Sequence, residues 1–347
     1  MQLLYQTKRK QGAAMREYEL EVLEHYDMEV RGTRRIRGAF FCETDKGTML
    51  LKETRISERR ASLLYSVLDH LEKGQELKVD TPVFTRDHEL LVISRDGTKY
   101  MMKKWFPGRE CEVRRENDLT TAAESLARLH LKLNESSAGE IVPDPPVHRD
   151  PLEELLRHNR EMKKVRTFIR ARVAKNEFEY LYLESFEKMY ALADRVFALM
   201  QDSGCMDLYN KSITEKTMAH GDYNYHNVLM LAEGTAVTNF EHICVDIQVR
   251  DLYYFLRKTM EKYHWKQKTG QNILRAYENI RPLSVSERNF IGLFLAYPEK
   301  YWKIASGYYH SNKAWLQEKS VEKLRTAIRQ SEEKYRFLEN VFSLKIL

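Results

Sequence analysis

The chain has 347 residues, of which 43% are hydrophobic and 31% charged, and its formal net charge is +6. This length can hold two domains with a large core, and the composition argues against disorder. The modest positive charge suits an anionic ligand such as a nucleotide and gives little support to nucleic-acid binding. The sequence contains no CxxC pattern, no recognisable signal peptide and no apolar run near the roughly 20 residues that cross a bilayer. We therefore expect a protein made in a reducing cytosol, without disulfides, a zinc site or a membrane span.

The first hundred residues predict a small α+β lobe. The expected elements are a helix over 15–26, strands over 40–44 and 48–52, a helix over 57–73, and strands over 90–94 and 99–103. A turn at Lys46-Gly47 joins the first strand pair and Asp96-Gly97 joins the second, which are hairpin signals. Ser57 is a suitable N-cap for the second helix, and Gly74 ends it. Strand, strand, helix, strand, strand is the order of a kinase small lobe.

A basic segment precedes the first hairpin. It contains Arg31, Arg34, Arg35 and Arg37. A solvated loop is the favoured interpretation, and a patch that contacts phosphates is the alternative. The loop over 34–39 is expected to cover the nucleotide phosphates, although it lacks a GxGxxG pattern.

Residues 104–108, which include Trp105-Phe106-Pro107-Gly108, interrupt the pattern and are the predicted hinge. Beyond the hinge, helices predominate: we expect them over 117–133, over most of 151–203 and over most of 250–342, with a loop at Pro143, Pro145 and Pro146. The predicted domains are therefore a nucleotide-binding lobe over 1–103 and a helical lobe over 109–347 that carries the catalytic loop.

The segment from His220 to Met230 carries the clearest chemical signal. Asp222 is followed five residues later by Asn227, just before an apolar strand. Phosphoryl-transfer enzymes of the kinase type use such an Asp to accept the substrate hydroxyl proton and such an Asn to hold Mg²⁺. We expect His220 to brace this loop through hydrogen bonds rather than to act as a base.

A third hairpin, over 228–231 and 236–240, contains Asn239 near its end, where a kinase carries its second metal-binding Asp. Magnesium prefers anionic oxygen ligands, so Asn239 should be a weak ligand. Glu241 and Asp246 are nearby carboxylates that could partly substitute. Asp251 has the sequence context of a helix N-cap.

Lys52 ends an apolar strand, where a lysine can neutralise the phosphates of a nucleotide. Its expected carboxylate partner on the following helix is not evident, because Glu58 lies too early and Glu72 lies in the last turn. The adenine is expected near 101–104. The predicted nucleotide-contacting residues are Lys52, Met101, Met102 and Lys103.

A family resemblance rests on these residues. The HGDxxxHN segment, the Leu51-Lys52-Glu53 strand and the helix over 125–130 resemble the aminoglycoside-phosphotransferase and choline-kinase branch of the protein-kinase-like fold. Across nearly the whole chain, the sequence is similar to the CotS-type spore-coat proteins of endospore-forming Firmicutes, notably through the HGDYNYHNVLM run and the segment over 237–252.

The resemblance implies an α+β, two-lobed kinase-like fold, with a small antiparallel-sheet lobe and a large mainly helical lobe. It implies Asp222 as catalytic base, Asn227 as a metal ligand and Lys52 as the phosphate-binding lysine, with ATP and Mg²⁺ as cofactors. It also implies deposition in the spore coat from the mother-cell cytoplasm, with other coat proteins as partners.

Two functions remain open at this stage. One is phosphotransfer from ATP to a hydroxyl of an unknown small molecule, bound among helices near 151–200 and 253–310. The other is a pseudokinase that acts as a structural or interaction component of the coat, which Asn239 and the glycine-poor loop favour.

Overall fold

The computed structural model describes residues 17–36, 38–74, 77–136, 144–310 and 318–346. The predicted positions Arg37 and Pro143 lie outside the described residues. The chain forms two compact units. Among the described residues, the small unit runs to Arg109 and also includes Leu229–Glu241, while most of the remaining chain forms the large unit. Asn239 and Glu241 are thus part of the small unit, although they follow the segment from His220 to Val228, which belongs to the large unit.

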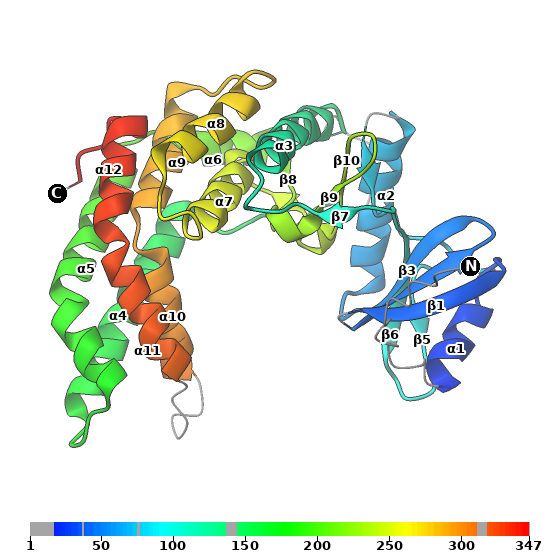
Figure 1. Ribbon diagram of the computed structural model, residues 1–347, viewed down its shortest axis with the longest axis horizontal. Coiled ribbons are helices and arrows are strands. Elements are labelled where there is room, and N and C mark those ends of the chain that lie inside the picture. Colours follow the sequence, from blue (N-terminus) through cyan, green and yellow to red (C-terminus); the bar gives the residue numbers. More distant parts are fainter. Residues whose placement is uncertain (1–16, 37, 75–76, 137–143, 311–317, 347) are drawn as a thin grey trace, which may run out of the picture. The chain divides into compact units, whose positions relative to one another are not determined.

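An antiparallel five-stranded sheet is the centre of the small unit (Figure 1). Its order is β1-β2-β3-β6-β5. The bounds are β1 Val30–Ile36, β2 Ala39–Thr44, β3 Gly47–Glu53, β5 Val92–Ile93 and β6 Lys99–Lys104. The predicted strands over 48–52 and 99–103 are therefore direct neighbours, because Lys52 pairs with Met101 in the β3–β6 register.

One face of this sheet forms an apolar core with helix α1 (Glu17–Glu24). Val22 and Leu23 of α1 join Leu51 and Met102 of the sheet in one buried cluster. Because side chains alternate along a strand, Lys52, Met101 and Lys103 share the opposite face. This alternation separates the core face from the face that carries the charged residues.

Helix α2 (Glu58–Lys73) follows β3 as predicted. The Ser57 side chain accepts a hydrogen bond from the Arg60 N–H, which is the expected N-cap. The buried side chains of Leu64, Leu68 and Leu71 lie along one side of the helix, and the chain turns at Gly74.

A second sheet has the order β4-β10-β9-β7. Its strands are β4 Lys78–Val79, β7 Arg109–Glu110, β9 Val228–Met230 and β10 Thr235–Val237. Strand β10 pairs parallel to β4, so that Val237 lies opposite Val79. This pairing fixes the segment that contains Asn239 against the small unit.

The large unit is mainly helical. Its helices are α3 Glu116–Ser136, α4 Pro151–Ala171, α5 Glu177–Gln201, α6 Cys205–Thr214, α7 Val249–Met260, α8 Gln267–Glu278, α9 Val285–Ala296, α10 Glu299–His310, α11 Glu318–Arg329 and α12 Ser331–Phe342. Helices α4, α5, α10 and α11 pack side by side (Figure 1). Strands β8 (Met218–Ala219) and β11 (Cys244–Val245) pair antiparallel.

Two elements differ from the sequence predictions. The basic segment is strand β1 rather than a loop, and the guanidinium groups of Arg34 and Arg35 lie over the rings of Phe41 and Phe40. The helical stretch predicted over 151–203 is two helices. The second of them starts at a capping box in which Asn176 and Glu179 satisfy each other's backbone N–H groups.

The buried ammonium of Lys334 ties α12 to the end of α9. It donates hydrogen bonds to the carbonyl oxygens of Ala296, at 3.0 Å, and Tyr297, at 3.1 Å. Burial lowers the pKa of Lys334 to about 8. Within the described ranges, no helix combines the length and the apolar character that a bilayer span requires.

Candidate active site

The catalytic-loop candidates Asp222 and Asn227 lie together in the large unit. Residues Tyr225–Asn227 form a 3₁₀ turn that leads directly into β9. The Asn227 amide donates to the Asp222 carbonyl oxygen at 2.8 Å and to its carboxylate Oδ2 at 3.0 Å. Asn224 donates to the same carbonyl at 3.0 Å and to Oδ1 at 3.1 Å. Two amides therefore fix the rotamer of the Asp222 carboxylate.

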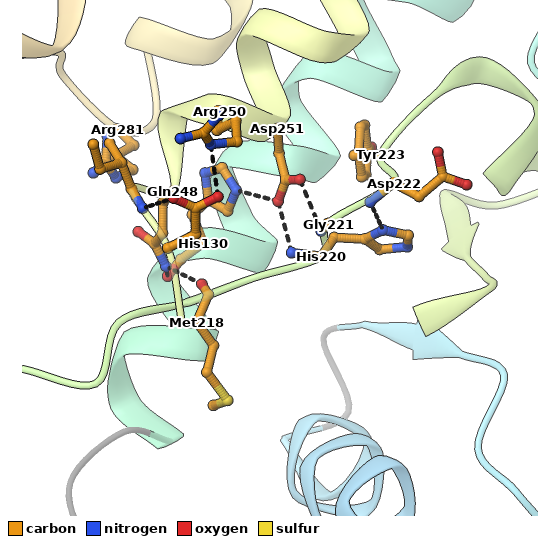
Figure 2. Close-up of polar contacts among 12 residues, drawn as sticks. His130, Met218, His220, Gly221, Asp222, Tyr223, Gln248, Arg250, Asp251 and Arg281 are labelled. Atoms are coloured by element: carbon orange, nitrogen blue, oxygen red, sulfur yellow. Dashed lines mark hydrogen bonds and ion pairs between the residues drawn. The ribbon is translucent and has the colours of Figure 1, made fainter. Parts of the chain in front are cut away.

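Asp251 of α7 braces this loop from behind (Figure 2). Its fully buried carboxylate accepts the backbone N–H of His220 at 2.7 Å and of Gly221 at 3.0 Å. His130 Nε2 lies 3.3 Å from the same carboxylate, and its Nδ1 lies 2.7 Å from the Tyr277 hydroxyl. The prediction of Asp251 as an N-cap is wrong, because the residue lies inside α7 and serves a distant loop.

The ionisation of this pair follows from its surroundings. Burial alone would raise the pKa of Asp251, but the hydrogen bonds from the His130 ring and from the His220 backbone N–H lower it. Burial lowers the pKa of His130, so this ring is neutral. A neutral ring beside a carboxylate must carry its proton on Nε2, and Nδ1 then accepts the Tyr277 hydroxyl.

His220 and Gly221 complete the support of Asp222. His220 Nδ1 accepts the Asp222 N–H at 3.2 Å, and the Asp222 carboxylate points away from this network (Figure 2). Gly221 has a φ of +81°, and a Cβ there would lie 2.2 Å from the carbonyl oxygen of His242. The bracing role expected for His220 agrees with these contacts, and only glycine fits at position 221.

A pocket of about 160 Å³ opens beside this loop within the large unit. Its lining includes Gly221, aromatic side chains from α7 and α9, charged side chains from α4, α7 and α10, and one carboxylate from the loop between β11 and α7. These are Glu154, Asp246, Arg250, Tyr253, Tyr254, Arg257, Phe294, Glu299 and Lys303. Burial and the nearby Asp222 carboxylate raise the pKa of the Tyr254 hydroxyl. Tyr254 therefore links the pocket to the catalytic-base candidate.

The predicted acceptor region overlaps this pocket only in part. Tyr253 and Tyr254 line it, whereas Trp302 instead stacks on His158 with ring centroids 3.4 Å apart. Asp246 is a poor substitute metal ligand, because its carboxylate lies 2.7 Å from Arg250 Nε and is almost fully buried. Burial raises the pKa of Asp246 above its usual value.

In the small unit, a chain of four charged groups surrounds Asn239. Lys52 Nζ lies 3.3 Å from Asn239 Oδ1 and 3.1 Å from Glu241 Oε1. Lys103 Nζ lies 3.4 Å from the same Glu241 oxygen and 3.3 Å from Asp80 Oδ2. The Asn239 N–H donates to Asp80 Oδ2 at 2.9 Å. The order of the charges is thus Asp80, Lys103, Glu241, Lys52.

Helix α2 supplies no carboxylate to Lys52 among the contacts of the described residues. Glu58 is exposed, and Glu72 pairs with Lys104 at 2.7 Å. Arg60 is the α2 residue that reaches this region, where its guanidinium donates to the Glu241 carbonyl oxygen at 2.8 Å. The partner of Lys52 is therefore Glu241, from a segment distant in sequence.

Of the four predicted nucleotide-contacting residues, three share one face of the sheet. Lys52, Met101 and Lys103 lie on that face, whereas the Met102 side chain packs into the apolar core with Leu51. Sequence reasoning missed Asp80, which is buried in the loop after β4 and has no motif around it. The signal that could have found it is an isolated charge between apolar strand residues.

The metal-ligand candidates differ in how well they fit a magnesium ion. Asn227 turns its amide nitrogen toward Asp222 and can therefore present its amide oxygen to a cation. Asn239 does not fit, because its amide oxygen accepts Lys52 and carries no charge. No group of three His, Cys, Asp or Glu side chains suited to a metal ion occurs within the described part of the chain.

The fold is that of known phosphotransferases. An aminoglycoside phosphotransferase from Alicyclobacillus acidocaldarius superposes with a TM-score of 0.81 at 18% identity, over 97% of this chain and 98% of that one. Spectinomycin phosphotransferase APH(9)-Ia, in complex with ADP and spectinomycin, gives a TM-score of 0.64 at 12% identity, over 90% of this chain and 96% of that one. At such identities the likeness concerns the fold alone, and it confirms the predicted α+β kinase-like architecture.

The sequence is similar to spore-coat proteins. Spore coat protein S of Bacillus subtilis (strain 168) is 23% identical over 337 residues, which cover 92% of this chain and 93% of that protein. A family model described as "Spore coat putative kinase YutH" matches residues 19–341. The predicted resemblance to kinase-like spore-coat proteins is confirmed, and the chain belongs to this family.

Proposed function

We propose that the protein is a nucleotide-binding component of the spore coat that transfers a phosphoryl group from ATP to a hydroxyl of a small molecule. The observation that carries this proposal is the double clamp of Asn224 and Asn227 on the Asp222 carboxylate. A turn with no chemical role has little need of a carboxylate fixed by two amides and a buried brace. The family and its nucleotide-binding structural neighbours support the same function.

In this proposal each residue has a stated task. Lys52 neutralises phosphate charge, and the sheet face that carries Met101 and Lys103 receives the nucleotide. Asp222 accepts the proton of the acceptor hydroxyl while the oxygen bonds to the γ-phosphorus and the bond to the leaving ADP oxygen breaks. Tyr254 and the pocket beside Gly221 hold the acceptor.

The proposal is tested by phosphotransfer and binding measurements on the full chain. Asp222→Asn should abolish phosphorylation of an acceptor from a panel of hydroxyl compounds, while ATP affinity measured by calorimetry stays unchanged. Lys52→Ala should weaken ATP binding. Asp194→Asn, an exposed position on α5, is the matched control for the loss of one carboxylate. Equal ATP affinity in wild type and Lys52→Ala would contradict the role of Lys52.

A pseudokinase is the second candidate, and the Asn239 contact favours it. An amide that accepts Lys52 at 3.3 Å stands where a kinase needs a charged metal ligand. In this case the protein acts as a structural or interaction component among other coat proteins, deposited from the mother cell. Spores that carry Asp222→Asn would then assemble a normal coat, and the purified protein would turn over no ATP.

A further inference from the structure

The most unusual feature of the small unit is that two ammonium groups approach a single carboxylate oxygen. Lys52 and Lys103 lie 3.1 and 3.4 Å from Glu241 Oε1. The β3–β6 register explains why they converge: Lys103 lies opposite Leu50, two residues before Lys52, so both side chains leave the same face of the sheet. Two cations around one anionic oxygen are also the arrangement that binds a phosphoryl oxygen.

We propose that Lys52 and Lys103 form a phosphate site that Glu241 plugs, and that this lysine pair holds the nucleotide phosphates without a divalent cation. The inference rests on the nucleotide binding proposed above. It deepens that function by assigning the metal's charge-neutralising task to Lys103.

Lys103 is suited to such a task because its position is fixed. Its side chain is 1% exposed, and the equally buried Asp80 holds it through Oδ2 at 3.3 Å. The other oxygen of Asp80 is buried without a hydrogen-bond partner. A buried ammonium anchored in this way presents a positive charge at a defined point, where screening by water is weak.

Glu241 is the displaceable member of the cluster. Its side chain is 18% exposed, and it borders an open pocket of about 650 Å³ together with Thr54, Arg55 and Thr98. With Glu241 in place, the two lysines face two carboxylates and the charges balance. When Glu241 leaves, one carboxylate faces two ammonium groups, and the excess positive charge attracts an anion.

The same cluster explains why a metal is dispensable. Asn239 offers no charge, and its amide oxygen accepts Lys52. The segment that would bring the second metal ligand therefore brings a carboxylate to the lysines instead, two residues later. The positive charge at this site comes from side-chain ammonium groups rather than from a bound ion.

The test is calorimetry of the full chain with ATP, in EDTA and in excess Mg²⁺. We expect the wild type to bind ATP in EDTA with an affinity within about twofold of that in Mg²⁺. Glu241→Gln, which keeps the size and an acceptor, should tighten binding on the order of tenfold, because it removes the competing charge. Inorganic triphosphate should show the same gain and adenosine none, which assigns the effect to the phosphate chain.

Lys103→Met should weaken ATP binding at least about tenfold, both in EDTA and in Mg²⁺. This change leaves the buried Asp80 carboxylate without its ion-pair partner, so the double variant Asp80→Asn/Lys103→Met serves as the version that is neutral for folding. Lys73→Met, which removes an exposed lysine of the same unit that pairs with Asp69 on α2, is the matched control and should bind as the wild type does.

ATP binding that requires Mg²⁺ and is unchanged in Glu241→Gln and in the double variant would overturn this inference and leave the proposed nucleotide binding intact. If no variant bound ATP in either buffer, the proposed function would fail and the inference with it. A gain for adenosine equal to that for triphosphate would also overturn the phosphate site.

Discussion

Replacing Asp251 with Asn should loosen the loop that carries Asp222 and destabilise the large unit. Each oxygen of the buried carboxylate accepts a backbone N–H, from His220 and from Gly221. An Asn of the same shape must turn its NH₂ group toward one of these donors. One of the two N–H groups then loses its acceptor and meets another donor. Removing the negative charge does not offset this loss. The pKa of Asp251 is lowered in the folded protein, which means that the fold favours the charged carboxylate.

The magnitude follows from these contacts. Losing a hydrogen bond to a charged group and leaving a buried donor unsatisfied costs about 3 kcal/mol. In a unit of this size, that corresponds to a fall in Tm of about 6 to 12 °C. Asp194→Asn, an exposed position in the same unit, should change the free energy of unfolding by less than about 0.5 kcal/mol.

Thermal unfolding followed by circular dichroism measures the loss of stability. Hydrogen exchange of the His220 and Gly221 amides measures the loosening of the loop. Both amides should exchange faster in Asp251→Asn than in the wild type. A Tm equal to that of Asp194→Asn, with unchanged protection of the two amides, would refute the bracing role.

Three other predictions concern single side chains. Asn239→Asp introduces a charged ligand and should strengthen ATP binding in Mg²⁺ by about 1 to 2 kcal/mol relative to ATP binding in EDTA. A lower Tm with no gain in affinity would mean that this segment does not accommodate a metal. Lys334 has a pKa of about 8 in the folded state, whereas an ordinary lysine has a pKa of 10.5. The unfolded state therefore binds more protons between these pH values, and the free energy of unfolding should rise with pH across this window by about 3 kcal/mol in total. Lys334→Met should lack this rise in a pH series of thermal unfolding, and parallel curves would contradict the assignment. Gly221→Ala should lower the free energy of unfolding by about 2 to 5 kcal/mol, because its Cβ would overlap a carbonyl oxygen. Gly234→Ala, which also has a positive φ but open space around it, should lower it by about 1 kcal/mol. Equal losses of Tm in the two variants would contradict the steric explanation.

Local patterns were sufficient for much of the small unit. The hairpin of β2 and β3 has a turn signal at its centre, and α2 has an N-cap at Ser57 and a leucine-rich face, so both could be predicted. Strand β1 was missed because its arginines lack the apolar alternation of a half-buried strand, and two of them instead cover aromatic rings. Strand β4 was missed because two residues paired to a distant segment leave no local period.

In the candidate site, too, local features could be predicted and long-range contacts could not. Asp222 and Asn227 lie five residues apart in one loop, so a motif could identify them. The brace from Asp251, and the contacts of Glu241 with Lys52 and Lys103, join residues that are far apart in sequence. Such contacts depend on the packed fold, and no spacing rule could reveal them. The roles assigned to these residues remain predictions.

The parallel pairing of β4 with β10 has a consequence for synthesis on the ribosome. The small unit needs Leu229–Glu241 to satisfy β4 and to give Lys103 its second carboxylate. The nascent chain emerges N-terminus first, so this unit stays incomplete until the helices from α3 to α6 have already left the exit tunnel. The small unit, which contains the N-terminal part of the chain, is therefore not the first unit to finish folding. A fragment that stops at Arg109 would present an unpaired strand edge and a buried lysine short of one counter-charge, both of which favour aggregation or capture by chaperones.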